Sequence, residues 1–193
     1  MKKLLILICF INLTSSGFCQ LENIEFVEEE ITIELNDSMI SVTGLYYYHN
    51  PGKQDRNISL MYPFPQNKFY GKAENVFAFE LNEPYKDVLA QANEHAATVR
   101  LSIEANRQKA LCIGYSQKLY GNRAEYIVST TRGWDKPLNL AGFELIVPDQ
   151  LKIDSLAYIP YDTLVGMGKI HYYFKEKDFW PESEFVIFFR KKY

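Results

Sequence analysis

Alternation of apolar and polar residues with a period of two runs along most of this chain. It is clearest at residues 27–35, where Val27, Ile31 and Leu35 share one parity and mostly glutamates share the other. Successive side chains of a β-strand point to opposite faces, so the pattern predicts a strand with one buried and one solvated face. Glu29 breaks the parity near the start, which indicates a fraying end or a bulge.

The same patterning predicts strands along the rest of the chain, about ten in all. The further segments are 40–48, 58–64, 75–81, 98–104, 109–119, 124–131, 138–147, 151–159, 169–174 and 184–189. Turn residues separate them at regular spacing, and strands do not alternate with helices. We therefore expect an all-β fold, an antiparallel β-sandwich with about ten strands.

One segment departs from the strand pattern. In residues 82–92, Tyr85, Val88, Leu89 and Ala92 fall at helical spacing behind a sequence that suits a helix cap. This spacing predicts one short helix packed against a sheet. An alanine-rich loop is the alternative interpretation.

The N-terminal segment has the features of an export signal. Lys2 and Lys3 precede an apolar run at 4–11, and a polar stretch of small residues follows. This order is typical of a secretory signal peptide, and the run is shorter than the roughly 20 residues that span a membrane. We expect residues 1–19 to be the signal peptide and residues 20–193 to form a single β-sandwich domain without a transmembrane segment. The domain would reside in the periplasm, outside the cell or at the cell surface.

Cleavage after Cys19 would release a soluble chain that begins at Gln20. The alternative is a lipoprotein anchored at Cys19, although Phe18 stands where such signals carry a small residue. Cleavage also removes Cys9, so that Cys112 remains alone and no intrachain disulfide can form. Because Cys112 lies in an apolar segment, we interpret it as a small core residue.

Charge and motif content exclude several classes of function. The formal net charge of −3 becomes −5 once Lys2 and Lys3 leave with the signal peptide, which argues against a nucleic-acid partner. No P-loop, dinucleotide-binding or serine-hydrolase motif is present, and His49, His95 and His171 match no metal-binding spacing. We expect no catalytic, cofactor-binding or metal-ligating residues and classify the chain as non-enzymatic.

Aromatic residues are the strongest compositional excess, with 14 Tyr, 13 Phe and 2 Trp. They fit either ordinary strand and core positions or a flat platform for a carbohydrate. In the segment 40–48, Tyr46 and Tyr48 share the apolar parity, whereas Leu45 and Tyr47 point the other way. Those two are either covered, which we favour, or exposed for a partner. The candidate binding residues are Trp134, Tyr47 and Trp180, with Trp134 in a turn-like segment as the best exposed ring.

Three triplets at 37–39, 154–156 and 162–164 read Asp, then Ser or Thr, then an apolar residue. The pattern resembles the acceptor sequence of a general bacterial O-glycosylation pathway for exported proteins. It makes Ser38, Ser155 and Thr163 candidate glycosylation sites. The alternative is structural, because Asp-Ser and Asp-Thr pairs also begin turns.

Two passages resemble a known family. Residues 45–50 with 60–65 are similar to the strand, Asn-containing turn and Tyr-x-Phe-Pro element of vault/inter-alpha-trypsin-type (VIT) β-sandwich domains, and 99–119 resembles their paired strands. Similar layouts occur in uncharacterised exported bacterial proteins, where a Thr-Trp-Pro stretch like 131–137 follows. The resemblance covers 25–147, brings no catalytic residues with it, and implies a β-sandwich that mediates contacts.

These observations favour an exported, non-enzymatic β-sandwich protein of the cell envelope that acts through protein–protein contacts with an unidentified envelope protein. The alternative is a glycan-binding module or a divergent glycoside-processing enzyme. It predicts a groove in which Trp134 or Trp180 lies beside a pair of carboxylates.

Overall fold

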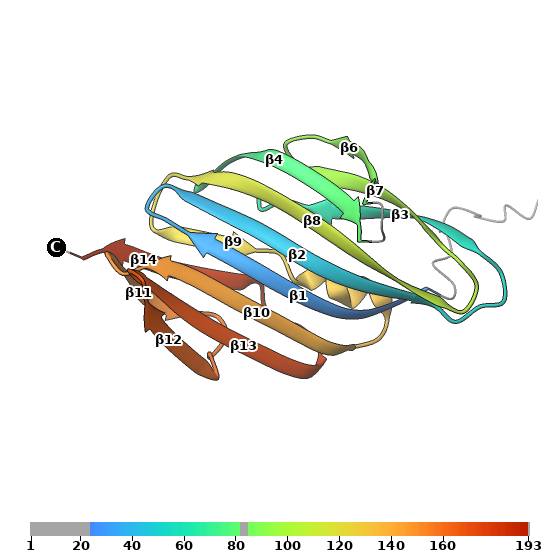
Figure 1. Ribbon diagram of the computed structural model, residues 1–193. Helices are drawn as coiled ribbons and strands as arrows, with labels where there is room; N and C mark the ends of the chain where they lie inside the picture. Colours follow the sequence, from blue (N-terminus) through green and yellow to red (C-terminus); the bar gives the residue numbers. More distant parts are fainter. Residues whose placement is uncertain (1–23, 82–84, 193) are drawn as a thin grey trace, which may run out of the picture.

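The computed structural model describes residues 24–81 and 85–192, so the predicted signal peptide lies outside the described residues (Figure 1). The described part is almost entirely β-structure, and none of its helices is long and apolar enough to cross a membrane. The strands are β1 (Glu25–Leu35), β2 (Met39–Asn50), β3 (Arg56–Pro63), β4 (Tyr70–Glu80), β5 (Lys86–Asp87), β6 (Leu89–Ala92), β7 (Ala96–Ile103), β8 (Arg107–Leu119), β9 (Arg123–Tyr126), β10 (Leu138–Pro148), β11 (Leu151–Leu156), β12 (Asp162–Gly166), β13 (Lys169–Phe179) and β14 (Phe185–Lys191). A short 3-10 helix, η1 (Ser129–Trp134), precedes β10.

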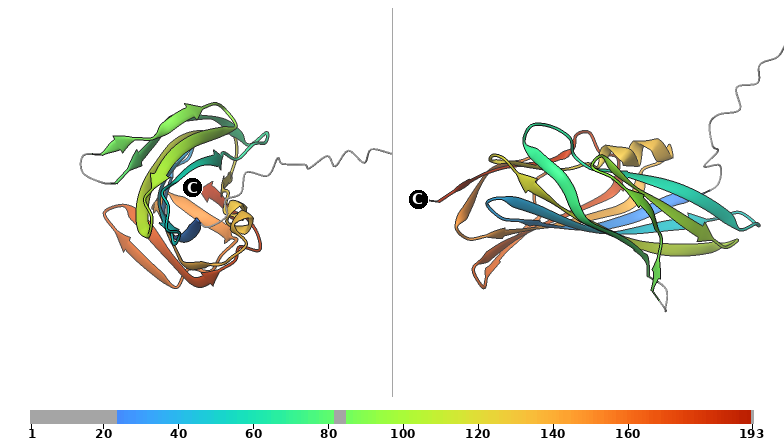
Figure 2. Two further views of the ribbon diagram at one scale, coloured as in Figure 1. Left: turned by 90° about the vertical axis from the view of Figure 1, so that its right-hand side faces the viewer. Right: turned by 90° about the horizontal axis from the view of Figure 1, so that it is seen from above.

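Eight strands form one sheet in the order β12-β13-β10-β1-β2-β8-β4-β5. Two three-stranded sheets, β11-β14-β9 and β3-β7-β6, accompany it. Seen end-on in Figure 2, the large sheet curls, with β7 and β3 over one half and β14 beside the other. The prediction of an all-β sandwich is confirmed.

The large sheet is mixed, because β1 and β10 pair in parallel while its other ladders are antiparallel. The prediction of a purely antiparallel sandwich is therefore wrong for the pairing of β1 with β10. Antiparallel neighbours follow from short hairpins, whereas β10 reaches β1 only after a long excursion through the other strands, and such a crossover allows either direction. The fourteen strands of the described part exceed the predicted number because β5, β6 and β12 are short and carry little alternation.

The predicted helix at 82–92 is wrong for the described residues 85–92, which form β5 and β6. Val88, between these strands, is buried, and its N–H donates to the carbonyl of Ala78 at 3.1 Å. Its own carbonyl accepts from the N–H of Arg100 at 3.1 Å. Because an isolated helix this short is marginal, backbone pairing to the sheets on both sides prevails.

The core lies between the sheets and collects the inward parity of each strand. In β1 the buried positions follow a bulge between Phe26 and Glu28, and so Glu29 faces inward with Ile31. The bulge that the broken parity indicated is confirmed. Val27, counted in the sequence among the apolar face, is only half-buried. The largest fully buried side chains are Phe64, Phe185, Ile33, Ile40, Leu101, Ile103, Leu111, Ile113, Leu138, Leu145, Leu151 and Ile187.

Candidate functional site

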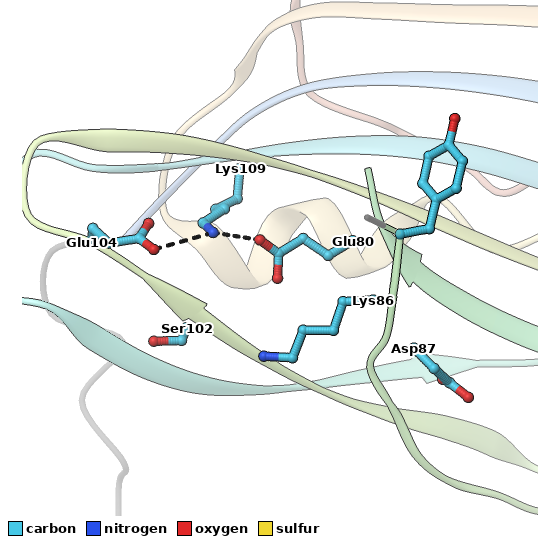
Figure 3. Close-up of a pocket in the computed structure, with 7 residues that line it drawn as sticks. Glu80, Lys86, Asp87, Ser102, Glu104 and Lys109 are labelled. Atoms are coloured by element: carbon cyan, nitrogen blue, oxygen red, sulfur yellow. Dashed lines mark hydrogen bonds and ion pairs between the residues drawn. The ribbon is translucent and has the colours of Figure 1, made fainter. Parts of the chain in front are cut away.

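Three features of the described residues could carry function: a charged pocket, a buried carboxyl among tyrosines, and an exposed apolar sheet edge. The pocket, with a volume of about 660 Å³, opens between β4, β5, β7 and β8 (Figure 3). Its lining residues are Glu80, Tyr85, Lys86, Asp87, Ser102, Glu104 and Lys109.

Lys109 is the central charge of the pocket. Its Nζ donates to a carboxylate oxygen of Glu80 and lies 3.3 Å from Glu104 Oε1. Burial lowers the pKa of Lys109, but the hydrogen bonds to Glu80 and Glu104 outweigh it, so the pKa is raised on balance. A buried ammonium is stable only when it is paired in this way. The ion pair therefore accounts for Lys109 without requiring a ligand.

The groove predicted for a glycan does not coincide with this pocket. Neither Trp134 nor Trp180 is among its lining residues, and the aromatic side chain at its rim is Tyr85, which is 70% exposed. In Figure 3, Lys86 extends its amine toward the space between Ser102 and Glu80. The pocket is therefore lined by charged residues and one exposed tyrosine, and neither predicted tryptophan contributes to it.

The three candidate binding residues are not brought together. Trp134, expected to be the best exposed ring, is half-buried and packs on Phe26 and Tyr48, with ring centroids 5.8 and 5.4 Å apart. It thus closes the inner side of β2, whereas Tyr47 lies on the outer side of the same strand. Trp180 is 42% exposed between β13 and β14, and none of its contacts in the described chain joins it to the other two.

Leu45, Tyr47 and Cys112 lie on the outer face of the large sheet, which explains why they are only half-buried. Leu45 pairs with Cys112, which in turn pairs with Phe79 of β4. All four side chains lie outside the core, and the thiol is half-buried rather than a core residue as expected. Its burial raises the pKa of Cys112 and disfavours the reactive thiolate. Strand parity explains the difference: Leu111 and Ile113 take the inward positions.

A buried carboxyl lies on the inner face of β1. Glu29 is 2% exposed, and its Oε1 has no hydrogen-bond partner among the described residues. Burial raises its pKa from 4.5 to about 8, so the side chain is mostly neutral at pH 7. Nearby, the hydroxyl of Tyr46 lies 2.9 Å from that of Tyr62 and 3.0 Å from that of Tyr126. The broken parity at Glu29 was the sequence signal for this feature.

The third feature is an apolar sheet edge, which we call the β12 edge and define by its five exposed large side chains. They are Ile159, Tyr161, Leu164, Val165 and Met167, with exposed fractions of 58% or more. Sequence reasoning missed this surface, because the predicted strand ended at 159 and the next triplet was interpreted as a turn or glycosylation site. The only signal was the density of apolar residues in a short, turn-bounded stretch.

The candidate glycosylation sites are accessible. Ser38, Ser155 and Thr163 are all exposed. The turn interpretation has support at Ser38, whose N–H donates to Asn36 Oδ1 at 3.0 Å. Ser155 and Thr163 lie in β11 and β12, so their triplets do not begin turns, although the N–H of Thr163 donates to Asp162 Oδ1 at 2.8 Å.

The histidines lie apart, each beside a single glutamate. His49 Nδ1 lies 3.2 Å from Glu25 Oε2, and His171 Nδ1 lies 2.8 Å from Glu144 Oε1. Within the described ranges, no group of three or more His, Cys, Asp or Glu side chains could hold a metal ion.

Comparison with known proteins identifies the fold but not a family. No family model matches the sequence, and no curated protein sequence matches it significantly. The fold is similar to that of a protein from Legionella pneumophila described as a candidate nutrient-binding protein, with a TM-score of 0.70 and 15% identity. That match covers 86% of this chain and 67% of the other.

Zinc metallopeptidases of the M1 class also match. One from Deinococcus radiodurans, bound to a Tyr-Ser-Ala substrate, has a TM-score of 0.52 and 9% identity over 87% of this chain. A two-domain M1 zinc metallopeptidase bound to L-tryptophan has a TM-score of 0.53 and 9% identity. This chain spans 42% of the first peptidase and 43% of the second. At these identities the likeness shows the fold alone, and the resemblance to VIT domains stays a prediction.

Proposed function

We propose that the chain is an exported, non-enzymatic β-sandwich module of the cell envelope that works through protein–protein contacts at the β12 edge. The observation that carries this proposal is the exposure of five large side chains in β12 and in the residues just before and after it, at the edge that the described strands leave open in the eight-stranded sheet. Large apolar side chains exposed close together in the chain favour a site that a partner or a membrane covers.

The location of the patch favours a protein partner. Leu164 and Val165 belong to a strand whose outer side has no neighbour among the described strands of the sheet. An unpaired strand offers a row of backbone N–H and C=O groups, and those groups are completed by a strand of another polypeptide. A lipid surface would not satisfy them.

The fold comparisons are compatible with this role. A candidate nutrient-binding protein and two-domain peptidases share the fold, and in the peptidases the matching part is less than half of a longer chain. Because this sandwich occurs as one part of longer proteins, the comparison supports the proposal that the chain is a module which works through contacts. The export part of the proposal rests on residues 1–19, and cell fractionation with an intact mass of the exported chain tests it. A mass that starts at Gln20 is expected, and an uncleaved or lipid-bearing chain contradicts it.

Site-specific photo-crosslinking in the native host tests the contact role. A photoreactive phenylalanine analogue at Leu164 should form adducts with protein, whereas the same residue at Met61 should not. Met61 is the matched control because it is 73% exposed on β3, which belongs to a different sheet from β12. No protein adduct at Leu164, or equal adducts at both positions, would contradict the proposal.

A further inference from the structure

We propose that the partner of the β12 edge is a second copy of this chain, with the two β12 strands paired antiparallel about a two-fold axis at Leu164. The inference rests on the proposed function and names the occupant of the same surface. Such pairing would join two eight-stranded sheets into one continuous sheet.

β12 is the outermost strand of its sheet, and β13 is its one neighbour among the described strands. All five of its residues are exposed. Natural edge strands are usually protected from pairing by lysine, proline or a bulge. β12 contains none of the three, and Asp162 is its single charge. The strand therefore lacks these three protections. The Asp162 carboxylate accepts from the N–H of Thr163 at 2.8 Å, a local bond that it would exchange for the contact with Lys169.

The sequence of β12 is complementary to itself in one register. In an antiparallel pair centred on Leu164, the two leucines face each other, Thr163 faces Val165, and Asp162 faces Gly166. Apolar side chains then meet at the axis, where a two-fold interface must be self-complementary. A register centred on Asp162 would set the two carboxylates against each other, which is unfavourable.

Charge complementarity selects the register at Leu164 through a lysine on the next strand. Within one copy, Gly166 pairs with Lys169 of β13. Directly opposed residues project from the same face of a sheet, so Asp162 of one copy, Gly166 of the second and Lys169 of the second share a face. Gly166 has no side chain, and no atom lies within 4 Å of the position a Cβ would take. The lysine can therefore reach across the glycine.

The distance is compatible with this ion pair. Two strand spacings separate the backbones of Asp162 and the second copy's Lys169, about 9–10 Å, which the two extended side chains span together. Lys169 is half exposed, and its present contact with Glu34 is long, 3.8 Å between Nζ and Oε2. Exposed pairs of this kind are weak and exchange readily. By symmetry, two such ion pairs would flank the leucines.

Both copies must carry the acid and the glycine on the edge strand and the lysine on the strand beside it for this match, which favours a second copy over an unrelated protein. The pairing covers only five residues on each side. Specific interfaces of small area are weak, so we expect a dimer that dissociates on dilution through the micromolar range.

Sedimentation equilibrium of residues 20–193 at increasing concentration should show the mass rising from monomer to dimer. Asp162→Lys and Lys169→Asp should each weaken the dimer about tenfold, because like charges then meet twice across the axis. The double variant should restore the wild-type dissociation constant. Met61→Lys, which adds a charge at an exposed apolar position elsewhere, should leave the constant unchanged.

Disulfide trapping tests the register in a Cys112→Ser background. Leu164→Cys should form an intermolecular disulfide under mild oxidation, because the two residues face each other across the axis. Val165→Cys is the matched control, since its side chain projects from the face opposite to Leu164 and the residue directly across from it would be Thr163, not the substituted position of the second copy. Equal trapping at both positions would overturn the proposed register.

The two proposals fail in different ways. A monomer at the highest concentration, with residue 164 crosslinked in cells to a different protein, would overturn the self-pairing while supporting the contact role of the β12 edge. A monomer whose residue 164 crosslinks to no protein would overturn both. A crosslinked product of twice the chain mass, lost in Asp162→Lys and regained in the double variant, is the expected result.

Discussion

The ring of Tyr46 lies directly over Gly44, two residues earlier in the same strand. A Cβ built on Gly44 would lie 2.2 Å from the hydroxyl oxygen of Tyr46 and 2.4 Å from the carbon that bears it. This close approach requires glycine, because a methyl group would occupy the same space as the ring. The glycine thereby allows the tyrosine to lie flat in the core.

This arrangement links all three sheets through one hydroxyl group. Tyr46 belongs to β2 of the large sheet, and its hydroxyl contacts that of Tyr62 in β3 and that of Tyr126 in β9. Buried hydroxyl groups are stable only when they are hydrogen-bonded. The position of the Tyr46 ring therefore determines whether three buried tyrosines are satisfied.

Gly44→Ala should lower the free energy of unfolding by about 2–4 kcal/mol, because it displaces the Tyr46 ring and breaks its hydrogen bonds. Urea unfolding followed by tyrosine and tryptophan fluorescence measures the change. Gly142→Ala is the matched control, since the nearest atom to its Cβ is the backbone oxygen of Glu29 at 3.9 Å. We expect a change below about 0.5 kcal/mol for the control. Equal effects at the two glycines would contradict the proposed role of the ring.

The buried carboxyl of Glu29 predicts a pH-dependent stability. Its pKa in the folded chain, about 8, lies above the value of 4.5 that applies when it is solvated. Between these two values the folded state keeps a proton that the unfolded state releases, so stability falls as pH rises from about 4.5 to about 8 and is level beyond. The tyrosines that face it, Tyr46, Tyr62 and Tyr126, have pKa values raised above 10 and add no charge in this window.

Glu29→Gln should abolish this contribution, because glutamine does not titrate. Relative to the variant, the wild-type chain should lose about 1.4 kcal/mol per pH unit across the window, or ~3 kcal/mol by pH 7. Urea unfolding at pH 4.5, 6, 7 and 8.5 measures the difference between the two chains, which cancels the titration of groups elsewhere. Parallel stability curves would show that Glu29 ionises normally in the folded chain.

The strands that sequence reasoning located are those with one buried and one solvated face, such as the segments around Ile33 and Val42. There, alternation reports burial directly. The parity break at Glu29 likewise marked the bulge. The β12 edge could not be predicted in this way, because exposure of Leu164 depends on strand order in the large sheet. That order is decided by tertiary packing, as is the parallel pairing of β1 with β10.

The buried ion pair in the pocket should contribute more to stability than the exposed ion pairs do. Lys109→Met removes the ammonium from its ion pair with the carboxylate of Glu80, which is 5% exposed. Loss of one member of a buried pair costs about 3–5 kcal/mol, so we expect destabilisation of that order in thermal or urea unfolding. Lys72→Met, which breaks an exposed pair with Glu94, should change stability by less than about 1 kcal/mol. Similar effects for both lysines would show that the pocket is solvated in solution.

Mass spectrometry of the chain purified from its native host should find hexose-containing modifications on Ser38, Ser155 and Thr163, since all three hydroxyls are exposed in the sequence context expected for O-glycosylation. Asp154→Ala should remove the modification at Ser155 while leaving that at Ser38 intact, because the triplet rather than exposure alone would be recognised.

Thr163 lies within β12, so a glycan there would compete with the pairing of two β12 edges. A partially modified preparation should therefore contain the glycan on monomer alone. Unmodified peptides covering all three residues would contradict the glycosylation prediction.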